Sequence, residues 1–166
     1  MKHYIRLSLL AAITINIALL TSCASAPRYH EVKASLVPES GKGLVIFYFK
    51  WGFLGGGPNR WNIIANDQLL TRDFKRGTFY SYQANPGELQ IYTKRGNWVL
   101  GMPEPSNFIP IYSRKIQIEP NQTYYMEAGF PSAWALDFPT FKHVSREEGE
   151  TEIKDCQWIN PSKTTR

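Results

Sequence analysis

The chain has 166 residues, of which 43% are hydrophobic and 20% charged, and its formal net charge is +5. This length and composition fit one globular domain with a short tail. Lys2 and Arg6 lie in a 22-residue N-terminal segment without Asp or Glu, which leaves +3 of the +5 for the rest of the chain. No basic run there has more than two adjacent cations, as in Lys94-Arg95, and this pattern argues against a nucleic-acid-binding protein.

Residues 1–22 have the pattern of a secretory signal peptide. A short basic start is followed by an apolar stretch from Leu7 to Leu20, which is shorter than the roughly 20 apolar residues of a membrane-spanning helix. A transmembrane anchor or a buried core helix would be the alternatives, but Asn16 and the early end of the stretch argue against both. We therefore expect this segment to be a targeting signal and not part of the fold.

The apolar stretch ends in Leu20-Thr21-Ser22-Cys23, an aliphatic residue and two small residues before a cysteine. This motif resembles the lipobox of bacterial lipoproteins. The resemblance implies that the chain is cleaved before Cys23, that the Cys23 sulfur carries a diacylglyceryl group and that the new amino group is acylated. Ala24 follows, in place of the Asp that retains such lipoproteins at the inner membrane. The implied location is the outer membrane, facing the periplasm.

Residues 23–42 are rich in Ala, Ser, Pro and Gly and show no lasting periodicity. We expect them to form a flexible, lipidated tether that spans roughly 25 Å as a coil. The next run, Gly43–Trp51, is apolar on both alternating faces. Such a run is typical of a central strand that is covered on both sides.

Further short strands are expected along the chain, separated by turn residues about every ten positions. Asn66-Asp67 tolerates the left-handed conformation of a tight turn and divides the first of these ranges into a hairpin. The expected ranges are Trp61–Thr71, Gly77–Ala84, Glu88–Lys94, Ser113–Pro120 and Thr123–Gly129. The pattern predicts a mainly all-β domain over residues 43–132, folded as an antiparallel β-sandwich.

Residues 133–166 are expected to form a C-terminal extension with one short helix. Ser145-x-x-Glu148 is a capping-box pattern, which predicts that the helix starts at Arg146. Gly149 weakens this helix. The glutamates of the helix are expected to face solvent. Ile153, Cys156 and Trp158 would pack the extension back onto the sandwich.

The middle of the chain resembles a family of small bacterial lipoproteins whose shared domain has no known function. Its members carry a G-x-Y-x-x-x-x-x-P-G-x-H core and a G-x-x-Y-Y strand. Here Gly77–Tyr80 runs to Pro86-Gly87 without the usual His, and Asn121–Tyr125 has Asn in place of the usual Gly. The resemblance covers about Gly43 to Lys154. It implies an immunoglobulin-like style of sandwich and no catalytic residue set.

Motifs for catalysis or for a metal are weak in this chain. His3, His30 and His143 do not form a metal-ligand spacing, and only His143 falls within the part of the chain expected to fold, so we expect no metal or cofactor. The glycine run in Phe53–Arg60 lacks the Lys-Ser/Thr ending of a phosphate loop. With Cys23 lipidated, Cys156 has no partner within the chain and is expected to be an inert thiol.

Aromatic residues next to expected loops suggest an interaction surface. The candidates are Trp51, Trp61, Trp98 and Phe108, unless they cap the ends of the core instead. The predicted function is therefore a non-catalytic module that binds an envelope protein. A glycan-binding module for peptidoglycan or lipopolysaccharide is the alternative, and a hydrolase with an unrecognised site is disfavoured.

Overall fold

A computed structural model of the chain describes residues 26–51, 60–95, 113–130 and 139–159. Cys23 and the candidate aromatics Trp98 and Phe108 lie outside these ranges. The elements in chain order are α2 (Tyr29–Val32), the 3-10 helix η1 (Lys33–Ser35), β1 (Gly43–Phe49), β2 (Trp61–Ala65), β3 (Gln68–Phe74), β4 (Thr78–Ala84), β5 (Gly87–Arg95), β6 (Arg114–Ile118), β7 (Thr123–Gly129), β8 (Thr140–Val144), α3 (Arg146–Ile153) and β9 (Gln157–Trp158).

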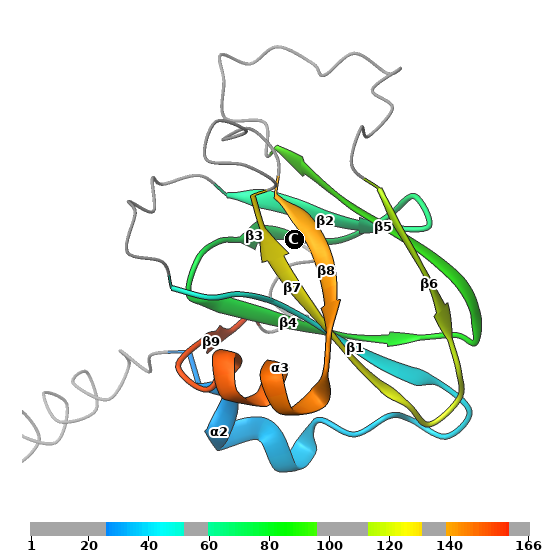
Figure 1. Ribbon diagram of the computed structural model, residues 1–166, viewed down its shortest axis with the longest axis horizontal. Helices are drawn as coiled ribbons and strands as arrows, with labels where there is room; N and C mark the ends of the chain where they lie inside the picture. Colours follow the sequence, from blue (N-terminus) through cyan, green and yellow to red (C-terminus); the bar gives the residue numbers. More distant parts are fainter. Residues whose placement is uncertain (1–25, 52–59, 96–112, 131–138, 160–166) are drawn as a thin grey trace, which may run out of the picture.

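Two sheets pack face to face, which confirms the predicted all-β sandwich (Figure 1). The first sheet has the order β8-β7-β1-β4-β9, and the second has the order β3-β2-β5-β6. The second sheet is antiparallel throughout, but the first is mixed, because β1 pairs in parallel with β7 and β4 with β9. Every residue of β1 is buried, as expected for a central strand.

The two faces of β1 belong to two separate apolar clusters. Val45, Phe47 and Phe49 point between the sheets, where they meet residues of β2 and β5 such as Ile63 and Ile91. The residues in between, on the outer face of the sheet, join Tyr29, Ile153 and Cys156. Both α2 and α3 therefore cover the outer face of the β1 sheet, as a third layer (Figure 1).

This outer layer corrects the predicted tether. Tyr29 is 3% exposed and packs edge-on against Phe79, at a distance of 5.6 Å between ring centroids. The chain is held at Pro27, whose carbonyl oxygen accepts a hydrogen bond from the Trp158 amide at 2.8 Å. Residues 28–42 are thus not a free linker, because the apolar outer face of the sheet requires a cover that this segment partly supplies.

The C-terminal part also differs from the expected extension with a single helix. β8 pairs with β7, and β9 pairs with β4, so the sandwich does not end at residue 132. The helix itself starts where predicted, since the Ser145 hydroxyl accepts a hydrogen bond from the Glu148 amide at 3.2 Å. Its Gly149, expected only to weaken the helix, lies where α3 crosses Tyr125 of β7 and leaves no room for a Cβ atom.

Candidate binding groove and the acidic cluster beside it

The candidate functional site is a groove on the outer face of the β1 sheet, next to α2, η1 and α3. Its volume is about 410 Å³. The lining residues come from three distant parts of the chain: Tyr29, His30, Lys33, Ala34, Leu36, Val37, Thr123, Tyr125, Arg146 and Glu150. Val37, at 59% exposed, is one of three large apolar side chains that face solvent among the residues that the structure describes. No motif in the sequence marks this site, because only folding brings these segments together.

A chain of hydrogen bonds crosses the groove through two buried tyrosines. The hydroxyls of Tyr29 and Tyr125 are 3.0 Å apart, and Tyr125 donates to Glu150 Oε1 at 3.3 Å. Because a hydroxyl has one proton to donate, Tyr29 is the donor to Tyr125. Burial, together with the hydrogen bond to Tyr29, raises the pKa of Tyr125. Tyr125 is therefore a neutral donor at any physiological pH.

Glu150 is the charged centre of the groove. Lys33 Nζ lies 2.7 Å from Glu150 Oε2, and Arg146 Nε lies 2.9 Å from Glu150 Oε1. The hydrogen bonds from Lys33 and then Arg146 hold the pKa of the Glu150 carboxyl below its usual value. The groove thus combines aliphatic side chains with paired charges of both signs, which suits binding of a partner better than proton transfer.

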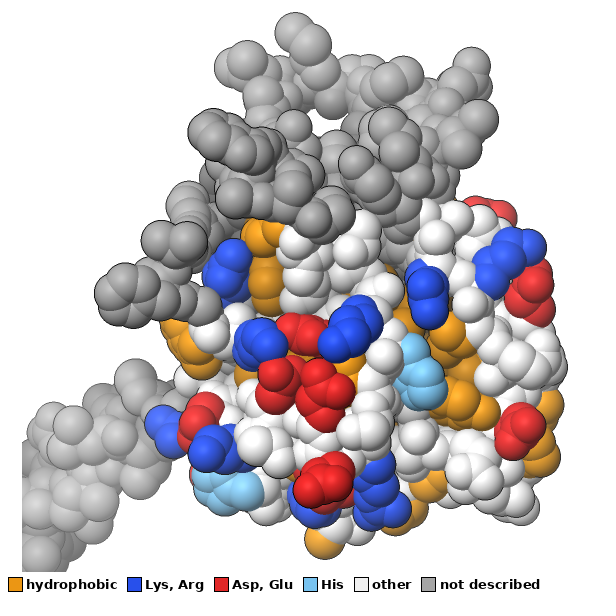
Figure 2. All heavy atoms as spheres, in the orientation of Figure 1, with side chains coloured by type: hydrophobic (Ala, Val, Ile, Leu, Met, Phe, Trp, Pro, Cys, Tyr) orange, Lys and Arg blue, Asp and Glu red, His pale blue; other side chains and the backbone are white. Residues whose placement is uncertain are grey.

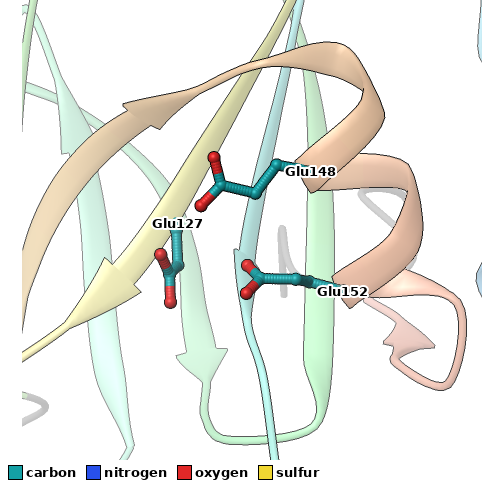
Figure 3. A group of neighbouring side chains, drawn as sticks. All are labelled: Glu127, Glu148 and Glu152. Atoms are coloured by element: carbon teal, nitrogen blue, oxygen red, sulfur yellow. The ribbon is translucent and has the colours of Figure 1, made fainter.

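An acidic cluster lies on the same outer face, next to the groove (Figure 2). Carboxylate oxygens of Glu127, Glu148 and Glu152 lie within 4.8 Å of one another and converge on one point (Figure 3). Such a trio could serve as ligands for a cation. Lys50 Nζ, however, is 2.8 Å from Glu127 and 2.6 Å from Glu152. The ammonium group thus pairs with two of the three carboxylates, and Lys142 Nζ lies 3.4 Å from Glu148 Oε1. These residues form an ion-pair network that ties α3 to β1 and β7.

Opposing effects act on Glu152 in this network. Desolvation acts to raise the pKa of its carboxyl, but hydrogen bonds from Lys50 and from the Tyr48 hydroxyl together hold that pKa below its usual value. The hydrogen bonds to Glu127 and Glu152 raise the pKa of Lys50. Glu150 and Glu152 were expected to be solvated, yet both are paired with cations because they face the sheet.

Of the four aromatic residues predicted to form an interaction surface, the two that the structure describes lie in different environments, one in the core and one on the surface. Trp61 is only 3% exposed and packs against Phe49 and Phe130 in the core between the sheets, so its assignment to a surface was wrong. Its ring closes the end of the sandwich instead. Trp51 is 69% exposed, as a surface residue should be.

The other residues considered for chemistry lie in unreactive surroundings. Cys156 is buried, its Sγ atom lies 3.8 Å from the Phe49 carbonyl oxygen, and desolvation raises the pKa of its thiol to about 12. His143 is exposed on β8 with its ring beside that of Tyr124. His30 is exposed at the rim of the groove. The environment of Cys156 is that of the expected inert thiol.

Compared with family models, curated proteins and solved structures, the chain has no significant match to any of the three. The resemblance to a lipoprotein family therefore stays a prediction. Among the described residues, no helix is both long and apolar enough to cross a membrane.

Proposed function

We propose that this chain is a non-catalytic lipoprotein of the bacterial cell envelope, anchored in the outer membrane through Cys23, whose sandwich binds a protein partner in the periplasm. The observation that carries the proposal is the position of Leu20-Thr21-Ser22-Cys23 directly after a basic and then apolar leader. Two or more acyl chains on one residue give stable attachment, because each buried methylene contributes about 0.8 kcal/mol.

The groove supports binding of a protein over binding of a glycan. Sugar rings are recognised by exposed aromatic faces, but both tyrosines of the groove are 3% exposed and offer only buried hydroxyls. Its rim instead combines the exposed aliphatic Val37 with the charged pair Lys33 and Glu150. Aliphatic contacts surrounded by charged groups are typical of protein interfaces.

Acylation is tested by replacing Cys23 with Ser. We expect the wild-type chain to incorporate labelled palmitate and to be processed, whereas Cys23→Ser should remain an unlabelled precursor. Label in the variant would overturn the assignment of Cys23. Replacing Ala24 with Asp should move the mature protein to the inner-membrane fraction, and unchanged fractionation would contradict the proposed outer-membrane location.

Partner binding is tested with a photo-crosslinking amino acid placed at Val37 in intact cells. Leu69 is the matched control, since it is also an exposed aliphatic residue (39%) but lies on β3 of the other sheet. We expect a discrete adduct with one envelope protein from position 37 and none from position 69. Sedimentation of the purified protein with peptidoglycan sacculi, without such an adduct, would favour the glycan-binding alternative.

A further inference from the structure

The distance between the proposed anchor and the folded domain is much shorter than the roughly 25 Å expected for a flexible tether over residues 23–42. The chain joins the fold at Pro27, because Pro27 accepts a hydrogen bond from Trp158, Arg28 bridges to Gln157, and the Tyr29 amide donates to Cys156. Only three residues separate Cys23 from Pro27. Even fully extended, these four steps span at most about 14 Å.

The edge of the sandwich at Pro27 also carries Trp51. Gln157 of β9 pairs with Thr78, and its amide donates to the Gly77 carbonyl at 2.8 Å. The indole ring of Trp51 lies directly against the α-carbon of Gly77. Neighbouring strands are about 4.8 Å apart, so the backbone of Gly77 is about two strand spacings, or about 10 Å, from Arg28.

Trp51 is suited to a lipid–water interface. Its side chain is 69% exposed, although one part of the ring is held against Gly77. The positive φ of Gly77 (+72°) and the lack of a side chain there allow this contact. Tryptophan is enriched at membrane interfaces because its ring is apolar and its N–H needs a polar neighbour. The Trp51 ring is thus exposed at the Pro27 edge of the sandwich, which the proposed anchor at Cys23 keeps close to the bilayer.

The charges at this edge fit an anionic or zwitterionic surface. Exposed basic groups are Arg28, Lys75 and Lys154, and the Arg76 guanidinium lies over the Phe49 ring at 4.9 Å. The exposed acidic groups of segments 26–31, 75–78 and 154–158 are Glu31 and Asp155. The Lys50 ammonium, on the residue before Trp51, is paired with Glu127 and Glu152. Within these described segments basic side chains outnumber acidic ones, which favours contact with anionic headgroups.

We propose that the sandwich lies directly on the phospholipid surface, with the Trp51 edge seated in the headgroup region, instead of standing clear of it on a tether. This inference rests on the proposed acylation of Cys23. A second contact beside the anchor fixes the orientation of the domain, because the short connection keeps Trp51 at a high effective concentration near the bilayer.

The test uses the purified acylated protein in vesicles of phosphatidylethanolamine and phosphatidylglycerol, with lipids brominated near the top of the acyl chains as quenchers. We expect wild-type tryptophan emission to be quenched, and Trp51→Ala to lose at least half of the quenched emission. Leu69→Ala, an exposed apolar side chain on β3, is the matched control and should behave as the wild type. Equal quenching in wild type and Trp51→Ala, or none in either, would overturn the proposal.

Length of the connection is tested separately, by inserting sixteen Gly and Ser residues between Ala24 and Ser25. We expect the quenching that depends on Trp51 to fall at least twofold, and unchanged quenching would contradict the role of the short connection. Vesicle flotation distinguishes failure of the anchor at Cys23 from failure of the contact at Trp51. A protein that does not float has lost its anchor, so the proposed function fails; a protein that floats with Trp51 unquenched contradicts only the seating of this edge.

Discussion

Gly149 of α3 lies against the Tyr125 side chain of β7, so closely that a Cβ atom on Gly149 would come within 2.5 Å of Tyr125 Cγ. This contact brings the helix close enough to the sheet for Glu150 to reach the Tyr125 hydroxyl and for Glu152 to reach Tyr48. The groove and the acidic cluster both depend on it. A glycine inside a helix is therefore explained here by packing and not by the helix itself.

Replacing Gly149 with Ala is expected to destabilise the protein by up to about 2 kcal/mol, because an overpacking cost of about 1–3 kcal/mol is offset only in part by the gain of about 1 kcal/mol in helix propensity. Urea unfolding followed by tryptophan fluorescence measures the change. Thr151→Ala, at an exposed position of the same helix, is the control and should stay within about 0.5 kcal/mol of the wild type. A Gly149→Ala protein that is more stable than the wild type would contradict the close packing.

Tyr29→Ala tests whether the segment before β1 belongs to the folded domain. Removing a buried aromatic side chain is expected to lower the free energy of unfolding by about 3–5 kcal/mol. His30→Ala, at the exposed neighbouring position, should have an effect below about 0.5 kcal/mol. If both variants unfold at the same urea concentration as the wild type, the segment is a free tether after all.

Lys50→Met should destabilise the protein in a pH-dependent way. The lowered pKa of Glu152 means that its pairing stabilises the fold above the unfolded pKa, about 4.3, and that this contribution is lost as the pH falls through the folded value. The raised pKa of Lys50 means that its contribution is lost as the pH rises through the folded value, above about 10.4. The network is thus strongest between these limits.

At pH 7 the loss in Lys50→Met is expected to be about 1 kcal/mol, since Lys50 is 45% exposed and solvent screens its pairs. The difference from the wild type should shrink below about pH 4, where the glutamates become protonated. Urea midpoints between pH 3 and pH 9 provide the measurement. A difference that stays constant across this range would show that Lys50 acts through packing and not through charge.

Cys156 should be unreactive until the protein unfolds. Its thiol is 1% exposed with a pKa of about 12, so very little thiolate is present at pH 8 and reagents have no access to it. With Cys23 acylated, we expect the reaction with an aromatic disulfide reagent at pH 8 to be at least about 100-fold slower in the native protein than in 6 M guanidinium. Comparable rates in both conditions would contradict burial of the thiol.

The strands and turns of this protein were accessible from the sequence because they follow from local rules. Alternation of apolar side chains marks a strand, and the residues Asn66 and Asp67 adopt the positive φ angles that a two-residue turn demands. The continuous apolar run of β1 likewise indicated a strand with two covered faces. A capping hydroxyl at Ser145 marked the helix start, since the bond reaches only three residues along the chain.

The sequence indicated that Ile153, Cys156 and Trp158 pack onto the sandwich, but only the tertiary structure showed that the segment before β1 also covers a sheet face. The segment from Tyr29 to Ser35 has the composition of a linker, and the burial of its Tyr29 depends on an apolar sheet face formed by residues far along the chain. The same holds for the parallel pairing of β1 with β7, for Trp61 in the core and for the groove, whose lining joins residues about 90 to 120 positions apart. Contacts between distant segments depend on the whole packing arrangement, and local patterns carry no information about it.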